Sequence, residues 1–458
     1  MSTDFASLPL SAAQLHNLKE LGYTQMRPIQ AQSLPAILEG KDVRGQAETG
    51  SGKTLAFGLG IVQKINPAFF GAQGIVLCPT RELADQVAQQ IRKLARALNN
   101  IKVLTLCGGS ALRPQIESLK HGAHIIVGTP GRVLDLLRGQ HLDLSHIKVF
   151  VLDEADRMMD MGFFDDIGEI SQATPLRKQT LFFSATFPEH ILKISEGFQR
   201  NPITVEMSPE AVNHNLDHLF FVTTPENRFA DCARLLKHYR PVSTLAFCNT
   251  KVQCEELADD LNHQGIVSLV LHGDMDQRDR EDVLVQFINR SCSVLVATDV
   301  AARGLDIDTL DAIINVELTP NVATHIHRIG RTGRKEAKGL ALNLVTDKEK
   351  YRAERIEKNI DLPVTWLDLP AQGKQKPLNP PMRTICIRGG KKEKLRPGDI
   401  LGTLTKDLGL PGSVVGKINI YDFVSFVAIE RKLAEETIEK LRKTNIKGKQ
   451  WMMRFMDT

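Results

Sequence analysis

The sequence predicts an α/β protein in which two doubly wound parallel-sheet domains are followed by a small C-terminal α+β domain. Three observations support this fold class. Short apolar runs alternate with amphipathic segments of helical period throughout residues 70–346. A stretch without helical period, 199–218, divides these runs into two comparable halves. A proline-rich break, 361–383, precedes a basic segment with a different order of elements.

Nine apolar runs are the predicted strands of the two sheets. Unbroken apolar residues are typical of strands buried on both faces, as in a parallel sheet covered by helices. Ligands bind at the carboxyl ends of such strands, where Thr, Asp, Ser and Asn collect in this sequence. The runs are GIVLCPT, HIIVGTP, VFVLDEA and TLFFSAT in the first half, and TLAFCNT, VSLVLHG, SVLVATD, AIINVEL and ALNLVTD in the second.

The C-terminal segment differs from the rest in pattern and in charge. Its elements follow the order βαββαβ, the ferredoxin-like split that RNA recognition motifs share with many unrelated domains. Residues 371–458 carry 18 Lys and Arg against 9 Asp and Glu, whereas the remaining residues carry 40 against 45. This segregation favours a polyanion-binding domain over a merely soluble appendage. The predicted bounds are 1–205, 216–362 and 384–458, with a linker at 363–383.

The composition excludes several classes of protein. The hydrophobic content of 42% and the charged content of 24% are those of a soluble globular protein. The sequence shows no signal-like segment and no apolar stretch of membrane-spanning length, so we expect a cytoplasmic protein without membrane association. Seven cysteines without a CxxC pair indicate reduced, buried thiols. His325 and His327 lack a neighbouring Cys or acidic ligand set, and no zinc site is expected.

The stretch AETGSGKT (47–54) resembles a phosphate-binding loop, with Ala where the Walker A pattern has its first Gly. Glycines allow backbone N–H groups to turn toward phosphate oxygens, and the next helix offers its positive N-terminus. A lysine reaches the β- and γ-phosphates, and a threonine hydroxyl binds Mg²⁺. The alternative is a Gly/Ser turn before a helix. The predicted nucleotide-binding residues are Ala47, Glu48, Thr49, Gly50, Ser51, Gly52, Lys53 and Thr54.

Three carboxylates, Asp153, Glu154 and Asp156, follow the run VFVL. A solvated turn opening a helix would explain them, because acids favour helix N-termini. With the phosphate-binding loop present, a magnesium site is the better interpretation, since the cation removes the mutual repulsion. Asp153 then binds Mg²⁺ together with Thr54, partly through water, and Glu154 polarises the attacking water.

A cationic segment, HRIGRTGR (327–334), lies in the second half of the chain. Arginines from a second domain can stabilise the charge that develops at a γ-phosphate, although a basic surface loop has the same composition.

These motifs occur in an order that resembles the DEAD-box RNA helicases. The resemblance implies two tandem RecA-like domains, with a Q motif within residues 3–31, and it spans residues 5–334. Its motifs are Phe5 with GYTQMRPIQ (22–30), AETGSGKT, PTRELA (79–84), Gly108–Gly109, TPGR (129–132), DEAD (153–156), SAT (184–186), FCNT (247–250), QRDR (277–280), ATDVAARGLD (297–306) and HRIGRTGR.

The resemblance implies ATP as the nucleotide. Gln30 would read the adenine edge with Tyr23 near the ring, Asp306 would lie near the ribose, and Arg331 and Arg334 would be arginine fingers. Residues implied to couple the two domains are Asp156, Ser184, Thr186, His327 and Arg328. Residues implied to contact the RNA backbone are Pro79, Thr80, Arg81, Gly109, Thr129, Gly131, Arg132, Thr250, Arg280 and Thr298.

The C-terminal segment resembles the divergent RNA recognition motif of the DbpA branch of this family. That resemblance implies a hairpin of large-subunit (23S) ribosomal RNA and pre-50S particles as partners. The run YDFVSFVAI has no Gly beside its aromatics, so we expect Phe423 and Phe426 to be core residues rather than stacking platforms. The expected RNA contacts are the loop lysines Lys391, Lys392, Lys394, Lys447 and Lys449.

Three activities fit these motifs: an ATP-dependent RNA helicase that locally unwinds short duplexes, an ATP-dependent RNA clamp without productive unwinding, and a DNA translocase. The Q motif, TPGR and the lysine-rich domain favour RNA over DNA. Helicase and clamp need the same closed cleft, so the residues leave both open.

Overall fold

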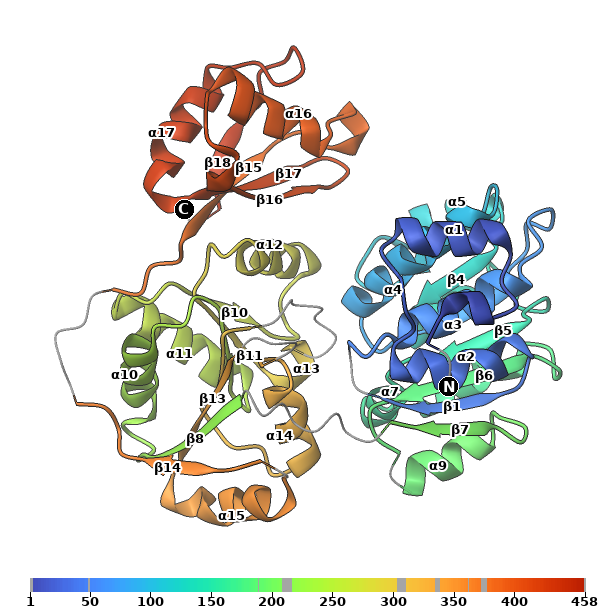
Figure 1. Ribbon diagram of the computed structural model, residues 1–458, viewed down its shortest axis with the longest axis horizontal. Coiled ribbons are helices and arrows are strands. Elements are labelled where there is room, and N and C mark those ends of the chain that lie inside the picture. Colours follow the sequence, from blue (N-terminus) through green and yellow to red (C-terminus); the bar gives the residue numbers. More distant parts are fainter. Residues whose placement is uncertain are drawn as a thin grey trace. The chain divides into compact units, whose positions relative to one another are not determined.

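The computed structural model describes residues 3–47, 50–187, 189–207, 216–302, 310–333, 338–360, 362–371 and 377–456. They form two compact units, one holding the described residues up to 207 and one holding those from 216 onward. The second unit contains a parallel-sheet domain and the small C-terminal domain (Figure 1).

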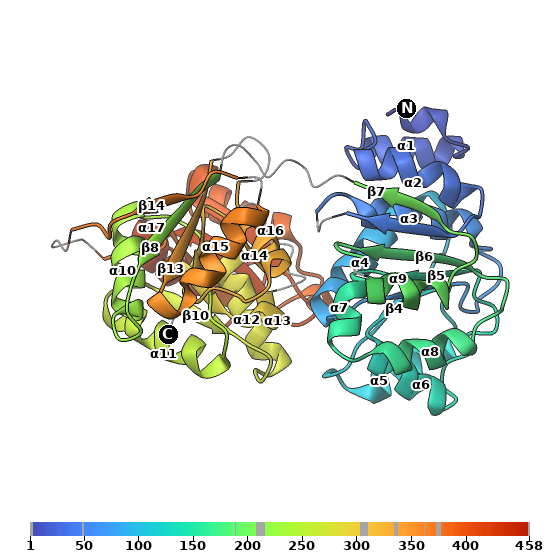
Figure 2. The ribbon, with the colours of Figure 1, turned by 90° about the horizontal axis from the view of Figure 1, so that it is seen from below.

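The first domain is built on a parallel sheet of seven strands in the order β3-β4-β2-β5-β6-β1-β7. Successive residues of its buried strands face opposite layers: Ile75 and Leu77 pack in one hydrophobic cluster, and Val76 packs in the other. Helices therefore cover both faces, with α1, α2 and α3 on one side and α5, α6 and α8 on the other (Figure 2).

The strands of this domain are β1 Val43–Gln46, β2 Gly74–Leu77, β3 Val103–Leu106, β4 Ile125–Gly128, β5 Val149–Leu152, β6 Gln179–Ser184 and β7 Ile203–Glu206. Its helices are α1 Ala12–Glu20, α2 Pro28–Leu38, α3 Lys53–Lys64, α4 Arg81–Leu94, α5 Leu112–Lys120, α6 Pro130–Arg138, α7 Ala155–Asp160, α8 Phe164–Gln172 and α9 Glu189–Glu196.

The second domain repeats this plan with the strand order β10-β11-β9-β12-β13-β8-β14. Its strands are β8 Leu216–Val222, β9 Thr244–Phe247, β10 Ser268–Leu271, β11 Val294–Ala297, β12 Ala312–Asn315, β13 Gly339–Val345 and β14 Thr365–Leu367. Its helices are α10 Arg228–Tyr239, α11 Lys251–His263, α12 Gln277–Ile288, α13 Asp299–Ala302, α14 Val322–Ile329 and α15 Lys350–Asn359.

The C-terminal domain is an antiparallel sheet in the order β16-β17-β15-β18, and its βαββαβ arrangement confirms the prediction. One sheet face packs on helices, and on the other face Cys386 and Phe426 pack against Val285 of α12. The Ser291 and Thr384 hydroxyls share a hydrogen bond of 2.7 Å beside this cluster. The elements are β15 Met382–Ile387, α16 Pro397–Gly402, β16 Val415–Ile420, β17 Ser425–Glu430, α17 Arg431–Arg442 and β18 Met453–Phe455.

All nine predicted strands are present, but both predicted connecting stretches contain additional strands. Within 199–218, β7 pairs with β1 and β8 begins at Leu216. Within 361–383, β14 pairs with β8, so the second domain extends beyond the expected limit at 362. The sequence predicts a linker at 363–383, and that prediction was wrong for Thr365–Leu367, which form β14. Pro363 and Pro370 flank this edge strand without interrupting it, a position that proline tolerates.

All seven cysteines are buried free thiols, as predicted. Within the described ranges, every helix is too short or too polar to cross a membrane.

Candidate nucleotide and RNA sites

The predicted phosphate-binding loop connects β1 to α3. Gly50 and Gly52 have φ angles of 90° and 98°, a left-handed conformation that favours glycine. Lys53, the first residue of α3, is 5% exposed, and its ammonium donates a hydrogen bond of 2.8 Å to the carbonyl of Ala47. The lysine is therefore held against the loop backbone at the positive end of a helix. Glu48 and Thr49 lie outside the described residues.

The Q-motif glutamine contacts this loop directly. Gln30 Nε2 donates to the carbonyl of Gly52 at 3.0 Å, and Gln30 Oε1 accepts from the backbone N–H of Arg27 at 2.8 Å. A Cβ at Gly52 would lie 2.4 Å from Gln30 Nε2, so this approach requires glycine. The hydroxyl of Tyr23 accepts a hydrogen bond of 2.6 Å from Gln90 of α4.

Asp153 directly follows β5, which is separated from β1 by β6 in the sheet, and it is 3% exposed. Burial raises the pKa of its carboxyl to about 6, although the Lys53 ammonium acts in the opposite direction. A divalent cation would stabilise the ionised carboxylate in this setting. The oxygens of Asp153 and Thr54 are the kind of ligand that Mg²⁺ prefers, so the residues fit that ion.

Glu154 has a left-handed backbone with φ 53°, which is unusual for a residue other than glycine. Its carboxylate accepts a hydrogen bond of 3.0 Å from the guanidinium of Arg157, and both side chains are less than 10% exposed. Such backbone strain is concentrated at functional sites. Sequence reasoning missed Arg157, although its position one helical turn after Glu154 in DEADRM was a visible signal.

Asp156 and the SAT segment are joined within the first domain, because β5 and β6 are neighbouring strands. Asp156 Oδ2 accepts hydrogen bonds from the N–H and the hydroxyl of Thr186, at 3.1 and 2.8 Å. The N–H of Asp156 donates to the Ser184 hydroxyl at 3.2 Å.

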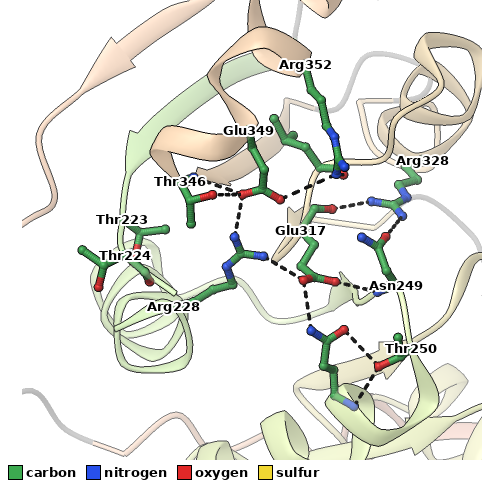
Figure 3. Close-up of polar contacts among 12 residues, drawn as sticks. Thr223, Thr224, Arg228, Asn249, Thr250, Glu317, Arg328, Thr346, Glu349 and Arg352 are labelled. Atoms are coloured by element: carbon green, nitrogen blue, oxygen red, sulfur yellow. Dashed lines mark hydrogen bonds and ion pairs between the residues drawn. The ribbon is translucent and has the colours of Figure 1, made fainter. Parts of the chain in front are cut away.

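Arg328 of α14 donates hydrogen bonds from all three guanidinium nitrogens within the second domain, and its side chain is 1% exposed. Figure 3 shows its contacts with Glu317 and Asn249. Arg328 binds the carboxylate of Asp299 through two hydrogen bonds of 2.7 and 2.8 Å, and it donates to Asn315 Oδ1 at 2.9 Å. Its guanidinium also lies over the ring of Phe247. This burial was not foreseen for a residue expected to couple the domains. His327 and Arg331 are partly exposed, whereas Asp306 and Arg334 lie outside the described residues.

The expected RNA contacts of the first domain gather at the ends of β2, β3 and β4, which are adjacent. Thr80 and Thr129 are the N-caps of α4 and α6, with Pro79 and Gly131 in the same turns. Arg81 lies against Gly109, where a Cβ would come within 1.6 Å of its guanidinium. Arg132 donates to the carbonyl of Ser110, in the loop that contains Gly109.

The second domain presents a matching edge at the ends of β10, β11 and β9. Thr250 is the N-cap of α11 and accepts a hydrogen bond from the N–H of Gln253 at 3.3 Å. Arg280 of α12 donates to the carbonyl of His272, and Thr298 directly follows β11. Hydroxyl groups at helix N-termini suit phosphate oxygens and read no base.

The five expected lysines of the C-terminal domain are exposed, and they lie in two loops that the fold brings together. Lys447 donates a hydrogen bond to the carbonyl of Lys394, across the two loops. The ammonium of Lys449 lies 4.4 Å from the centre of the Trp451 ring. The two aromatics differ: Phe426 is a 4% exposed core residue as predicted, but Phe423 is 67% exposed, so that prediction was wrong. Phe423 lies in the turn between β16 and β17, where nothing covers it in the described structure.

Three family models match the chain: DEAD/DEAH box helicase at residues 27–194, helicase conserved C-terminal domain at 227–336, and DbpA RNA binding domain at 384–454.

Two relatives match over nearly their whole length. The chain is 48% identical to the ATP-dependent RNA helicase DbpA of Escherichia coli, covering 99% of this chain and 100% of that protein. It is 35% identical to DbpA of Bacillus subtilis, covering 97% and 98%. Among solved structures, S. cerevisiae Dbp5 bound to RNA and ADP BeF3 has a TM-score of 0.72 and 30% identity, and the match covers 80% of this chain and 96% of that one.

Proposed function

Since the chain belongs to the family of DEAD-box ATP-dependent RNA helicases and is of the DbpA type, we propose that its target is a hairpin of 23S ribosomal RNA during assembly of the 50S subunit. The observation that supports this target is the C-terminal domain. It matches the DbpA RNA binding domain, and two loops carrying five exposed lysines meet on it. Cationic loops of this kind bind RNA through its phosphates. Two such loops held side by side recognise the shape of a folded RNA through the positions of its phosphates, without reading its bases.

The proposed catalytic roles follow from the geometry of the first domain. Lys53 binds the β- and γ-phosphates from the start of α3. Glu154, oriented by Arg157, accepts the proton of the attacking water. Asp153 and Thr54 hold Mg²⁺, which when bound neutralises charge on the phosphate oxygens. Arg331 and Arg334 supply further positive charge at the γ-phosphate.

The proposed RNA path uses the two edges lined by helix N-termini, with Thr80, Thr129 and Thr250 as representative contacts. These groups bind the backbone without sequence preference. Preference for one RNA must then come from the C-terminal domain.

The proposal is tested by replacing Lys391, Lys392, Lys394, Lys447 and Lys449 with Gln and measuring the ATPase rate with intact ribosomal RNA and with a generic polymer. We expect the preference for ribosomal RNA to fall by at least about tenfold, while stimulation by the polymer stays within about twofold of the wild type.

A charge control replaces three other lysines, Lys432, Lys440 and Lys443, which are exposed on or just after α17. If the control lost the preference equally, net charge rather than the two loops would be responsible. Full preference in the loop variant would reject the proposed target site. Strand displacement of a duplex of roughly one helical turn then separates helicase from clamp.

A further inference from the structure

A chain of polar contacts in the second domain joins the turn after β9 to helix α14 (Figure 3). Glu317, two residues after β12, lies at its centre. Glu317 Oε2 accepts a hydrogen bond of 3.1 Å from the N–H of Asn249, and Glu317 Oε1 accepts one of 3.0 Å from Gln253 Nε2. Gln253 Oε1 in turn accepts from the hydroxyl of Thr250 at 3.0 Å. One carboxylate therefore fixes both sides of the turn that carries Thr250.

Glu317 and Asn249 also bind Arg328. The carbonyl oxygen of Glu317 accepts a hydrogen bond of 2.9 Å from Arg328, and Asn249 Oδ1 accepts one of 3.3 Å. Arg328 precedes Arg331 by three residues in HRIGRTGR. Hydrogen bonds through Glu317 and Asn249 thus connect the turn expected to contact RNA directly to the segment expected to face ATP.

The charge of Glu317 is balanced by Arg228 of α10, at 3.0 Å from Oε1. Arg228 also binds Glu349 at 2.5 Å, and the side chains of Arg228, Glu317 and Glu349 are 10%, 17% and 9% exposed. Charge-assisted hydrogen bonds are strong where water is largely excluded. Glu317 is therefore rigidly held, and a shift of the Asn249 turn moves the contacts of Arg328 as well.

We propose that Glu317 is a positioning residue that couples RNA binding at the Thr250 turn to the ATP-facing segment around Arg328 and Arg331. The inference rests on the proposed role of Thr250 in RNA binding. Coupling between two ligands is reciprocal, so RNA that orders the turn tightens ATP binding by the same factor as ATP tightens RNA binding.

The test compares Glu317→Gln with Glu349→Gln in the full chain. Both variants remove a carboxylate from Arg228, but only Glu317 contacts the turn. The Kd of a non-hydrolysable ATP analogue is measured with and without ribosomal RNA. The coupling ratio is the Kd without ribosomal RNA divided by the Kd with it. We expect this ratio to fall by at least about fivefold in Glu317→Gln and to stay at the wild-type value in Glu349→Gln.

A second variant, Gln253→Ala, cuts the connection to Thr250 without touching the charged pair, and it serves if Glu317→Gln fails to fold. We expect it to lower the ratio as well. In addition, the effects of Glu317→Gln and Thr250→Ala on the RNA concentration for half-maximal ATPase are expected to be non-additive.

Unchanged ratios in Glu317→Gln and Gln253→Ala, or strictly additive effects, would show that Glu317 is only structural and overturn the proposal. An equal fall of the Kd ratio in Glu349→Gln would also overturn the proposal, because general destabilisation of the domain would then explain the fall in Glu317→Gln. A wild-type ratio of one would overturn the coupling itself, whereas the proposed RNA target is judged separately by the lysine variants.

Discussion

The Thr186 hydroxyl and the Asp156 carboxylate are 2.8 Å apart in a hydrogen bond that joins the ends of β6 and β5. The N–H of Thr186 donates to the same carboxylate oxygen at 3.1 Å. Because Glu154 lies two residues before Asp156, we expect a displacement in the proposed nucleotide site to reach the SAT segment through this contact.

Thr186→Ala is expected to impair strand displacement more than ATP hydrolysis. The lost hydrogen bond to a charged group is worth roughly 1.5–3 kcal/mol, which corresponds to about tenfold or more in displacement rate. RNA-stimulated ATPase should change by less than about threefold, because Thr186 is not one of the proposed phosphate contacts. Thr186→Ser keeps the hydroxyl and serves as the control. Equal losses of both activities in Thr186→Ala would contradict this role.

Glu154→Gln is expected to lower kcat for ATP by roughly 10²–10⁴, because the amide cannot accept the proton of water. The amide still fits beside Arg157, so ATP and RNA should bind with affinities within about threefold of the wild type. Single-turnover hydrolysis and equilibrium binding of a fluorescent ATP analogue check the two halves of this prediction. Multiple-turnover ATPase at the wild-type rate would rule out Glu154 as the base.

The raised pKa of Asp153 predicts how stability depends on pH. Between the ordinary carboxyl pKa of 3.8 and the value of about 6, the folded state binds more protons than the unfolded state, so stability falls as pH rises through this window. Above it, the buried charge costs at most about 3 kcal/mol. Asp153→Asn should therefore raise the Tm of the ligand-free protein near about pH 8, and this gain should vanish toward about pH 4.

Thermal unfolding across that pH range measures the difference, and the ATPase of the same variant should be lost because the proposed Mg²⁺ site has lost a carboxylate. An Asp153→Asn protein that is less stable than the wild type near about pH 8 would mean that the electrostatic attraction of Lys53 outweighs the desolvation of Asp153.

The sequence was sufficient for the strands with unbroken apolar runs and for the motifs that end them. GIVLCPT, VFVLDEA and TLFFSAT form β2, β5 and β6, and sheet order then brings Asp156 to Thr186. β1 was not predicted because Arg44 and Gln46 interrupt its apolar pattern, and β14 was not predicted because prolines surround it. A short strand held by its neighbours has little local signal of its own.

The residues that support the motifs could not be found in this way. Glu317 ends an ordinary strand run and Arg228 begins an ordinary helix, and their partners lie far away in the sequence. Only the sheet order β9-β12-β13 brings their segments together. A network assembled from long-range contacts has no motif of fixed spacing in the sequence. A phosphate-binding loop has one, because its residues are consecutive.

Arg328 and Arg331 should respond differently to substitution, although they belong to one motif. Arg328 is buried and its two-point contact with Asp299 is completed by Asn315. Removing one partner of such a pair costs about 3–5 kcal/mol, so Arg328→Ala should lower the Tm by roughly 10 °C. Arg328→Lys should recover part of this loss, because an ammonium keeps the charge but cannot reproduce the two-point contact of the guanidinium with Asp299.

Arg331 is only partly buried, and Arg331→Ala should change Tm by no more than about 3 °C while reducing kcat by about 10²-fold or more, as expected for loss of charge at the γ-phosphate. Calorimetry of the ligand-free variants together with RNA-stimulated ATPase distinguishes the two cases. If Arg328→Ala unfolded at the wild-type temperature and lost only ATPase, its bonds to Asp299 and Asn315 would not be holding the second domain together. Its main role would then be the coupling of the two domains that the resemblance implies.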